Sequence, residues 1–362
     1  MVDEVHMVGQ EGRGAALESL ITKLLYLREV RNTSVQIIAM SATVGNLTEL
    51  AAFLQADLFT DNFRPVELQE FVKVGRDILT VRAGHSEQFS LARRLPEDEP
   101  GVRAVDEDGV CQLVLEVYPT HSVLVFCDSK RRCEALAELL VRVLALLGRL
   151  ESSLQHRRAE KAELLTALAA DGAGQVGRTI ILLVWTVMFC IKVCPVLRRT
   201  VPAGIAYHHS GLTMDERKVL EEGYLTGVLG VLCCTSTLAA GVNLPARRVV
   251  IRSHLMGRVQ LTPAQYRQMA GRAGRAGLDT AGESFLLVGA AQARIVPDIV
   301  AAPVERAASC LEGAQLAGLL LSCLHLGLAS SPAQLHRYCP WGFSDPNVSL
   351  SQLFYTLFHQ FM

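Results

Sequence analysis

A run of glutamine, arginine and glycine near residue 270 has the residue types that phosphate chemistry requires. Gln268, Arg272 and Arg275 lie at positions i, i+4 and i+7, so a helix would project an amide and two guanidinium groups from one face. Arginine stabilises the charge on a phosphoryl group during its transfer. Gly271 and Gly274 would destabilise an ordinary solvated helix, but beside a ligand they let the backbone approach closely. We therefore interpret residues 268–275, the arginine segment, as a phosphate site.

An acidic pair near the start of the sequence is the second chemical group. Asp3 and Glu4 follow Val2, which we interpret as the last residue of an apolar strand. An aspartate at a strand end can hold Mg²⁺ on the phosphates of a nucleotide, and an adjacent carboxylate can polarise the attacking water. An isolated acidic pair is more often a solvated surface pair, so this interpretation depends on the rest of the chain.

Small hydroxyl residues follow two of the predicted strands. Ser41, Ala42 and Thr43 come directly after the apolar run 35–40, and a single helix between them and Asp3 fits a β-α-β step. Hydroxyl groups there can hydrogen-bond the carboxylates of the neighbouring strand.

A second hydroxyl group opens residues 235–245, the hydroxyl segment. It contains Thr235, Ser236 and Thr237, followed by Gly241 and Asn243. Hydroxyls and backbone amides at a strand-to-helix turn suit a sugar-phosphate backbone or the phosphates of ATP. An ordinary capped helix is the alternative interpretation.

The histidine pair His208–His209 raises the question of a metal site. No third ligand stands at a zinc-like spacing, and the ten cysteines include no Cys-x-x-Cys pair. We expect His209 to hydrogen-bond within a loop, and we expect neither zinc nor an iron–sulfur cluster.

Short apolar runs alternate with helical stretches, which is typical of a parallel sheet wrapped by helices. Polar or glycine-containing residues follow each run, where α/β folds place their chemistry. Residues 16–27 have helical spacing, and Thr213 with Glu216 forms a capping box. The predicted strands are 35–40, 122–127, 230–234, 248–251 and 284–288.

Two stretches have the composition of connections between elements, residues 62–67 and residues 94–109. We place a domain boundary at the first. The sequence then divides into a first domain over 1–62, a second over 63–290 and a leucine-rich helical or winged-helix module over 291–362.

An unusual apolar insertion occupies residues 176–193. Its continuous apolar part begins at Thr179, carries Lys192 and stops before Pro195, so it is shorter than the roughly 20 residues of a membrane-spanning helix. We favour a buried strand or a foreign insertion, such as translated intron, over a membrane span.

Bulk composition excludes some classes of protein. The net charge is −1 over 362 residues, so any nucleic-acid contact must come from local patches. The first residues do not resemble a secretory signal, and the scattered cysteines do not resemble a disulfide framework. A reducing, intracellular compartment fits best.

In this order, the segments resemble the motifs of superfamily 2 helicases, in the branch that includes the helicase POLQ-like proteins, the helicase region of DNA polymerase theta and their archaeal relatives. The likeness extends from about residue 3 to residue 287. Motifs II, III, IV, IVa, V and VI correspond in order to residues 3–6, 41–43, 124–127 with 129–130, 207–212, 235–245 and 268–275.

The resemblance implies an α/β fold with two RecA-like parallel-sheet domains, the first incomplete, and then a partial winged-helix or helical module. It implies ATP and Mg²⁺ as cofactors, with Asp3 on the metal and Glu4 activating water. His6 and Gln268 would couple ATP to DNA, and Arg272 and Arg275 would contact the γ-phosphate. Nucleotide contacts would also come from Gly241 and Asn243. Residues implied in nucleic-acid contact or coupling are Ser41, Ala42, Thr43, Ser129, His209, Thr235, Ser236 and Thr237.

The implied activity is 3′-to-5′ unwinding of DNA in the repair of stalled or cross-linked replication forks, in the nucleus, with DNA-repair proteins as possible partners. The sequence departs from the family because no lysine follows a glycine, so the Gly-Lys-Thr phosphate loop is missing. We therefore expect a fragment, truncated at both ends, that hydrolyses little ATP alone. The alternatives are an RNA helicase of the same superfamily, or an inactive isoform that only binds DNA or protein partners.

Overall fold

The chain forms two compact units in the computed structural model. Residues 63–302 form one of them, the sheet unit, and residues 1–62 with 303–362 form the other, the terminal unit. The structure describes residues 1–9, 14–30, 34–41, 44–61, 63–81, 89–97, 99–170, 193–239, 242–311 and 313–328.

A single eight-stranded sheet organises the sheet unit, in the order β3-β2-β1-β10-β7-β4-β6-β5. The six strands from β1 to β5 in this order are parallel, whereas β2 and β3 are antiparallel additions at one edge. The strands are β1 (Glu67–Val74), β2 (Asp77–Val81), β3 (Phe89–Arg94), β4 (Val123–Cys127), β5 (Ile205–His208), β6 (Val231–Thr235), β7 (Arg248–Ile251) and β10 (Ala281–Val288). The prediction of an α/β fold with a large, mostly parallel sheet is therefore confirmed.

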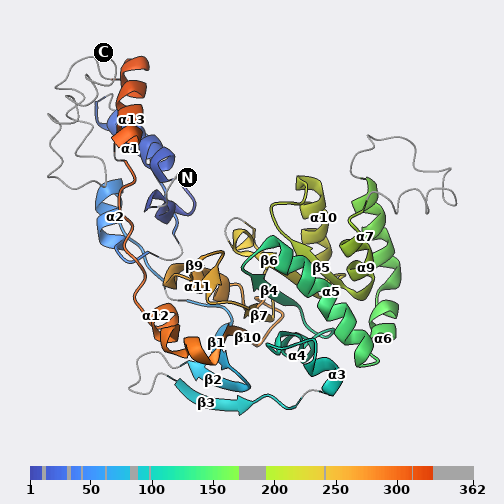
Figure 1. Cartoon of the computed structure of the whole chain (residues 1–362). Coiled ribbons are helices and arrows are strands. Elements are labelled where there is room, and N and C mark those ends of the chain that lie inside the picture. The colour runs from blue at the N-terminus through green and yellow to red at the C-terminus, as the bar shows by residue number, and fades with distance from the viewer. Residues whose placement is uncertain are drawn as a thin grey trace. The chain divides into compact units, whose positions relative to one another are not determined.

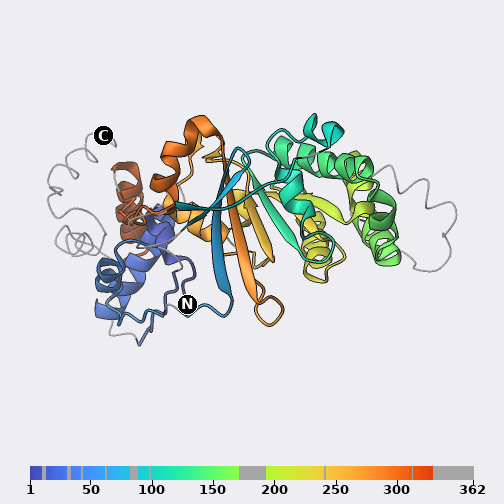
Figure 2. The ribbon, with the colours of Figure 1, turned by 90° about the horizontal axis from the view of Figure 1, so that it is seen from below.

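The central strands β4 and β7 consist almost wholly of buried residues, because helices cover both faces of a parallel sheet. Their continuous apolar runs made them recognisable in the sequence. β1 lies beside β10 in the centre of the sheet although the two are far apart in the chain (Figure 2). Phe71 and Phe285 stack across this pair with their ring centroids 4.9 Å apart.

The two predicted connections contain regular structure. Residues 62–67 end on the first residue of β1, and residues 94–109 include the end of β3 and the short helix α3 (Pro100–Arg103). β1, β2 and β3 were not predicted, because polar residues interrupt their apolar positions. Tyr207 and His208 lie in a further strand that was not predicted, the buried β5.

Helices surround the sheet, as Figure 1 shows. They are α4 (Val110–Leu115), α5 (Lys130–Leu146), α6 (Leu150–Gln155), α7 (Arg158–Ala170), α9 (Pro195–Thr200), α10 (Met214–Leu225), α11 (Pro263–Ala270) and α12 (Val296–Val300). The short hairpin β8 (Leu255–Met256) and β9 (Val259–Gln260) precedes α11. The predicted capping box is confirmed at α10, where Thr213 and Glu216 each accept a hydrogen bond from the other's backbone.

The terminal unit combines the two ends of the described chain. Its elements are the 3₁₀ turn η1 (Val5–Gly9) and the helices α1 (Gly14–Val30), α2 (Leu47–Leu54) and α13 (Gly313–His325). The side-chain amide of Asn46 pairs with both backbone groups of Ala307, at 3.0 and 2.8 Å. Buried Glu18 accepts hydrogen bonds from Ser309 and Cys310. Residues 303–311 are thereby fixed to the N-terminal segment.

The predicted strand at 35–40 is wrong as a regular strand. Within the described residues 34–41, only Ala39 forms a bridge, and its partner is Val2 in parallel orientation. The third predicted domain, over 291–362, stays a prediction because residues 329–362 lie outside the described chain. In the described part, residues 303–328 belong to the terminal unit and residues 291–302 to the sheet unit.

The predicted apolar insertion at 176–193 falls almost wholly outside the described residues, which resume at Val193. No helix in the described ranges is both long and apolar enough to span a bilayer.

Lys161 of α7 is a buried cation, with only 2 % of its surface exposed. Its Nζ donates to the backbone carbonyl of Ser153 at 2.7 Å. Burial lowers the pKa of Lys161 to about 8. Between this value and its ordinary pKa of 10.5, the unfolded chain binds more protons than the folded chain at this residue. The contribution of Lys161 to stability therefore rises with pH across this window.

We expect the Lys161→Met variant to be more stable than the parent at pH 7 and to lose that advantage, by up to about 3 kcal/mol, as the pH approaches 10. Urea unfolding of both proteins, followed by circular dichroism at several pH values, measures the difference. Subtracting one protein from the other cancels the ionisation of the buried thiols Cys233 and Cys234, whose pKa values burial also raises. A difference that stays constant with pH would contradict the prediction.

Candidate functional site

Three of the predicted site segments meet at the carboxyl ends of neighbouring strands. Thr235 ends β6, and its register partner Cys127 ends β4 just before Ser129. His209 follows β5, the neighbour of β6 on its other side. The hydroxyls of Thr235 and Thr237 lie 2.9 Å apart at the surface, and Ser129 caps α5 by accepting from the amide of Arg132. Ser236 begins the 3₁₀ turn η3 (Ser236–Leu238). We name the five predicted site residues at these strand ends the carboxyl-edge cluster: Ser129, His209, Thr235, Ser236 and Thr237.

Hydrogen bonds fix the orientation of the two histidines. Nδ1 of His209 accepts from the amide of Gly211 at 3.1 Å, so its Nε2 carries the proton and faces Glu134 at 3.0 Å. Nε2 of His208 lies 2.7 Å from Glu221. Burial lowers the pKa of His208, and Glu221 opposes the shift. No group of three or more metal-ligating side chains occurs in the described residues.

The helix predicted for the arginine segment is wrong beyond residue 270. α11 ends at Ala270, with Gly271 as its C-cap, and half-buried Gln268 lies in its last turn. The chain then turns through Gly274, whose φ of 93° lies in the region that favours glycine. A Cβ at Gly274 would lie only 2.7 Å from Cγ1 of Val66, so a larger residue does not fit there. The two arginines therefore project from a turn and not from one helix face.

Backbone hydrogen bonds place the arginine segment at the opposite edge of the sheet from the carboxyl-edge cluster. Ala273 forms a parallel bridge with Ala246, which stands two residues before β7. The amide of Gly274 donates to Ala246 at 2.6 Å, and that of Ala246 donates to Arg272 at 2.9 Å. Arg272 therefore lies beside the amino ends of β7 and β10.

The hydroxyl segment connects these two edges. It begins at Thr235 in the carboxyl-edge cluster and runs to Pro245, just before Ala246. Along this path, the guanidinium of Arg272 donates to the carbonyl of Ala239 and reaches Oδ1 of Asn243 at 3.5 Å. Gly241, predicted to contact nucleotide, lies outside the described residues.

Arg275 has a partner that the sequence reading missed. Asp279 accepts from Nε and Nη2 of Arg275, each at 3.0 Å, and from its backbone amide at 2.8 Å. The hydrogen bonds that Arg275 donates to Asp279 raise the pKa of Arg275. Burial alone would raise the pKa of Asp279, but Arg275 outweighs it and holds that pKa below its usual value. To contact a phosphate, Arg275 would have to exchange this carboxylate for it. The four-residue spacing between the two residues was the available signal.

The acidic pair belongs to the terminal unit. The amide of Val2 donates to the carbonyl of Ile38 at 2.7 Å, and the amide of Met40 donates to the carbonyl of Val2 at 2.8 Å. These bonds bring the residues that follow Val2 close to those that follow Met40. Glu4 adopts a positive φ of 51°, a conformation that is uncommon for residues other than glycine and is frequent at functional sites.

The side chains of this group converge on His6. Its Nδ1 lies 3.4 Å from a carboxylate oxygen of Glu4 and 3.2 Å from the hydroxyl of Ser41. Asp3 is exposed, and one of its oxygens accepts from the amide of Glu4 at 2.9 Å. Ala42 and Thr43 lie outside the described residues. The structure thus brings Glu4, His6 and Ser41 together, with the hydroxyl of Ser41 on His6 and not on a carboxylate as predicted.

A cavity of about 530 Å³ opens at the carboxyl ends of β1, β7 and β10. Ion pairs and hydrogen bonds already occupy much of its charged wall: Arg252 pairs with Asp108 at 2.7 Å, and Lys73 donates to the carbonyl of Asp108. It contains none of the predicted site residues.

Comparison with known proteins shows which family the chain resembles. Residues 160–277 match the helicase conserved C-terminal domain. The chain is 43% identical to a helicase POLQ-like protein of Drosophila melanogaster and 41% identical to one of Homo sapiens, over 93% of this chain in each case. This chain belongs to the helicase family. An ATP-dependent DNA helicase Hel308 of Methanococcus vannielii is 32% identical over 79% of the chain.

The matched helicase domain includes β5, β6, β7, α11 and the whole arginine segment. It begins in α7, so it covers only part of the sheet unit. The chain spans about 30% of the length of the helicase POLQ-like proteins, 30% and 29% in these two cases, and 34% of the length of the archaeal helicase.

Proposed function

We propose that this chain is part of an ATP-dependent DNA helicase, with nucleic acid bound at the carboxyl-edge cluster and the γ-phosphate of ATP bound by Arg272 and Arg275. The proposal extends to 3′-to-5′ unwinding at damaged or stalled replication forks, in the nucleus. It is supported by membership of the helicase family and by the chemistry of both groups of side chains.

The observation that carries the proposal is the path of the hydroxyl segment. One continuous stretch exposes the hydroxyls of Thr235 and Thr237 at one edge of the sheet and contacts Arg272 at the other. A shift of Arg272 towards a phosphate would break its bond to Ala239, which lies at most four residues from these hydroxyls in the chain. Nucleotide binding at Arg272 and nucleic-acid binding at the hydroxyls of Thr235 and Thr237 are therefore mechanically coupled.

The acidic pair fits a magnesium ion held with a nucleotide. Mg²⁺ keeps several waters and takes few protein ligands beside the phosphates, and Asp3 offers an exposed carboxylate for this role. When bound, the ion would neutralise charge on the β- and γ-phosphates. Glu4 would orient water, and His6 would transmit the state of Glu4 to Ser41 through the 3.4 and 3.2 Å contacts.

An RNA helicase is the alternative within the same superfamily, because hydroxyl groups that contact a phosphate backbone discriminate poorly between the two nucleic acids. A protein that binds DNA or protein partners without hydrolysing ATP is the other alternative. Because the sequence contains no Gly-Lys pair, we propose that residues 1–362 alone hydrolyse little ATP.

Binding of fluorescent oligonucleotides to residues 1–362 tests the nucleic-acid part of the proposal. We expect single-stranded DNA to bind more tightly than RNA of the same sequence, and Thr237→Val to weaken DNA binding by about fivefold through loss of one phosphate hydrogen bond. Thr166→Val on the exposed face of α7 is the matched control, with no expected effect. Tighter RNA binding would favour the RNA helicase, and no binding to either would refute the site. DNA-stimulated ATP hydrolysis by this chain would contradict the expected inactivity.

A further inference from the structure

Arg64, the second residue of the sheet unit, holds the backbone of the arginine segment. Its Nη2 donates to the carbonyls of Ala273 at 2.7 Å and Gly271 at 3.3 Å, and its Nε donates to Val66 at 3.0 Å. Gly271 and Ala273 are the residues directly before and after Arg272. A single planar guanidinium therefore fixes the turn from which Arg272 projects.

Arg267 makes a corresponding contact at the other end of the sheet unit. It lies in α11, one residue before Gln268, and its Nη2 donates to the carbonyl of Ala302 at 2.8 Å. Ala302 is the last residue of the sheet unit. The last turn of α11, which leads into the arginine segment, is thus tied to Ala302, and Arg64 holds the turn that follows.

These two contacts coincide with the places where the chain passes between units. It crosses only twice, between Asn62 and Phe63 and between Ala302 and Pro303. Beyond the second crossing, residues 303–311 are fixed to Gly45 and Asn46, shortly after Ser41, by the bonds to Glu305 and Ala307. Within two residues of each covalent crossing there is therefore an arginine contact: Arg64 contacts the arginine segment, and Ala302 contacts Arg267, the residue just before that segment.

We propose that Arg64 and Arg267 are positioning residues that transmit displacement of the two inter-unit connections to Arg272. The inference rests on the proposed function only for what Arg272 then contacts. Tension on residue 63 acts on the carbonyls beside Arg272 through Arg64, and tension on residue 303 acts on the last turn of α11 through Arg267. Five donors in a rigid plane suit arginine to this role, whereas lysine carries one flexible ammonium group.

Hydrogen exchange of residues 1–362 tests the positioning directly, without ATP. The amides of Arg272, Ala273 and Gly274 are hydrogen-bonded to Met269, Ala270 and Ala246, so their exchange reports the order of the turn. We expect these three amides to exchange at least about ten times faster in Arg64→Met than in the parent. The increase should be smaller in Arg64→Lys and Arg267→Met. Strand β10 should exchange as in the parent.

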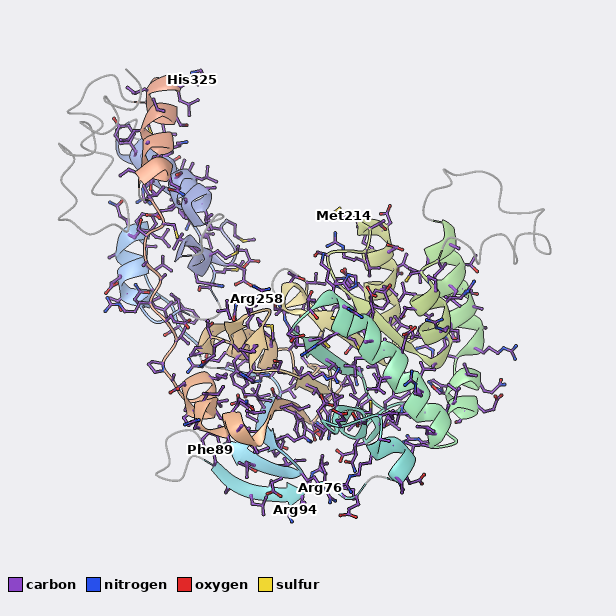
Figure 3. All side chains as sticks on the ribbon, in the orientation of Figure 1. Arg76, Phe89, Arg94, Met214, Arg258 and His325 are labelled. Atoms are coloured by element: carbon purple, nitrogen blue, oxygen red, sulfur yellow. The ribbon has the colours of Figure 1, made fainter. Side chains whose placement is uncertain are left out.

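Arg94→Met is the matched control. Arg94 lies on the edge strand β3 (Figure 3), where it pairs with Asp77 at 2.6 Å, and its replacement should leave the turn protected. Unchanged exchange in both Arg64→Met and Arg267→Met would overturn the proposal. If Arg64→Met also accelerates β10, general unfolding is the cause, and Arg64→Lys and Arg267→Met then decide the question.

Kinetics separate positioning from simple support. In a protein that also contains the phosphate-binding loop, we expect Arg64→Met to lower kcat for ATP hydrolysis about tenfold or more with little change in KM, and Arg64→Lys to restore part of it. An equal change in KM would contradict positioning of Arg272. If the parent hydrolyses no ATP, the proposed function fails, while the exchange result still stands or falls by itself.

Discussion

Replacement of Arg272 by lysine or methionine is expected to lower DNA-stimulated ATP hydrolysis by about a thousandfold, the range found when an arginine that stabilises a transferring phosphoryl group is lost. The measurement requires a protein in which a phosphate-binding Gly-Lys-Thr loop precedes residues 1–362. Lysine does not substitute, because its single flexible ammonium group lacks the planar fork of donors with which a guanidinium binds two phosphate oxygens at once. Steady-state kinetics with saturating single-stranded DNA measure the loss.

The control for this experiment is Arg94→Met, which removes an arginine of the same unit from an exposed ion pair. Its activity should equal that of the parent. A loss of less than about tenfold in both Arg272 variants would show that Arg272 does not contact the reacting phosphate. Circular dichroism of each variant excludes unfolding as the reason for lost activity.

Arg248→Met is expected to destabilise the sheet unit by about 3–5 kcal/mol, the usual consequence of removing one partner of a buried ion pair. Arg248 is 5 % exposed and begins the central strand β7. It pairs with Glu116 at 2.7 Å and with Glu283 at 2.6 Å, and its guanidinium lies 4.7 Å from the ring centroid of Phe285. Methionine fills the volume but leaves two partly buried carboxylates without this cation.

Arg93→Met provides the comparison, because Arg93 also pairs with Glu116 at 2.7 Å but its side chain is 41 % exposed. A loss of at most about 1 kcal/mol is expected for it. Urea unfolding at pH 7 measures both variants. Equal losses for Arg93 and Arg248 would contradict the importance of burial, and a loss below about 1 kcal/mol for Arg248 would show that the pair is not stabilising.

The central strands and several helices of this fold could be predicted from local sequence. Strands β4, β6 and β7 are short apolar runs with turn residues after them, and the capping box at Thr213 identifies the start of α10 by a local hydrogen-bond pattern. These signals are local because burial on both faces favours apolar residues at most positions of a strand. β1 carries charged residues such as Lys73, whose burial depends on hydrogen-bond acceptors supplied by the carbonyls of Gly75 and Asp108. Asp108 is distant in the chain, so local sequence does not reveal this partner.

The arginine segment shows the same limit within the candidate site. Its spacing suited a helix. Backbone hydrogen bonds with Ala246, which lies well before the segment in the chain, instead hold it as a turn after Gly271. Helical spacing is a local tendency, whereas the competing backbone partners come from another part of the fold. The pairing of Arg275 with Asp279 was within reach of sequence reasoning, and the contact of Arg272 with Ala239 was not.

The sequence by itself determined which residue types are available: the acidic pair at Asp3, the hydroxyls from Thr235 and the arginines at 272 and 275, together with the order that marks the helicase family. Tertiary structure decided where they lie. It placed the hydroxyls and the arginines at opposite ends of the parallel strands and joined them by the hydroxyl segment. The physical reason is that side-chain chemistry is a property of each residue, whereas the edge of a sheet that a residue reaches depends on the pairing of strands distant in sequence.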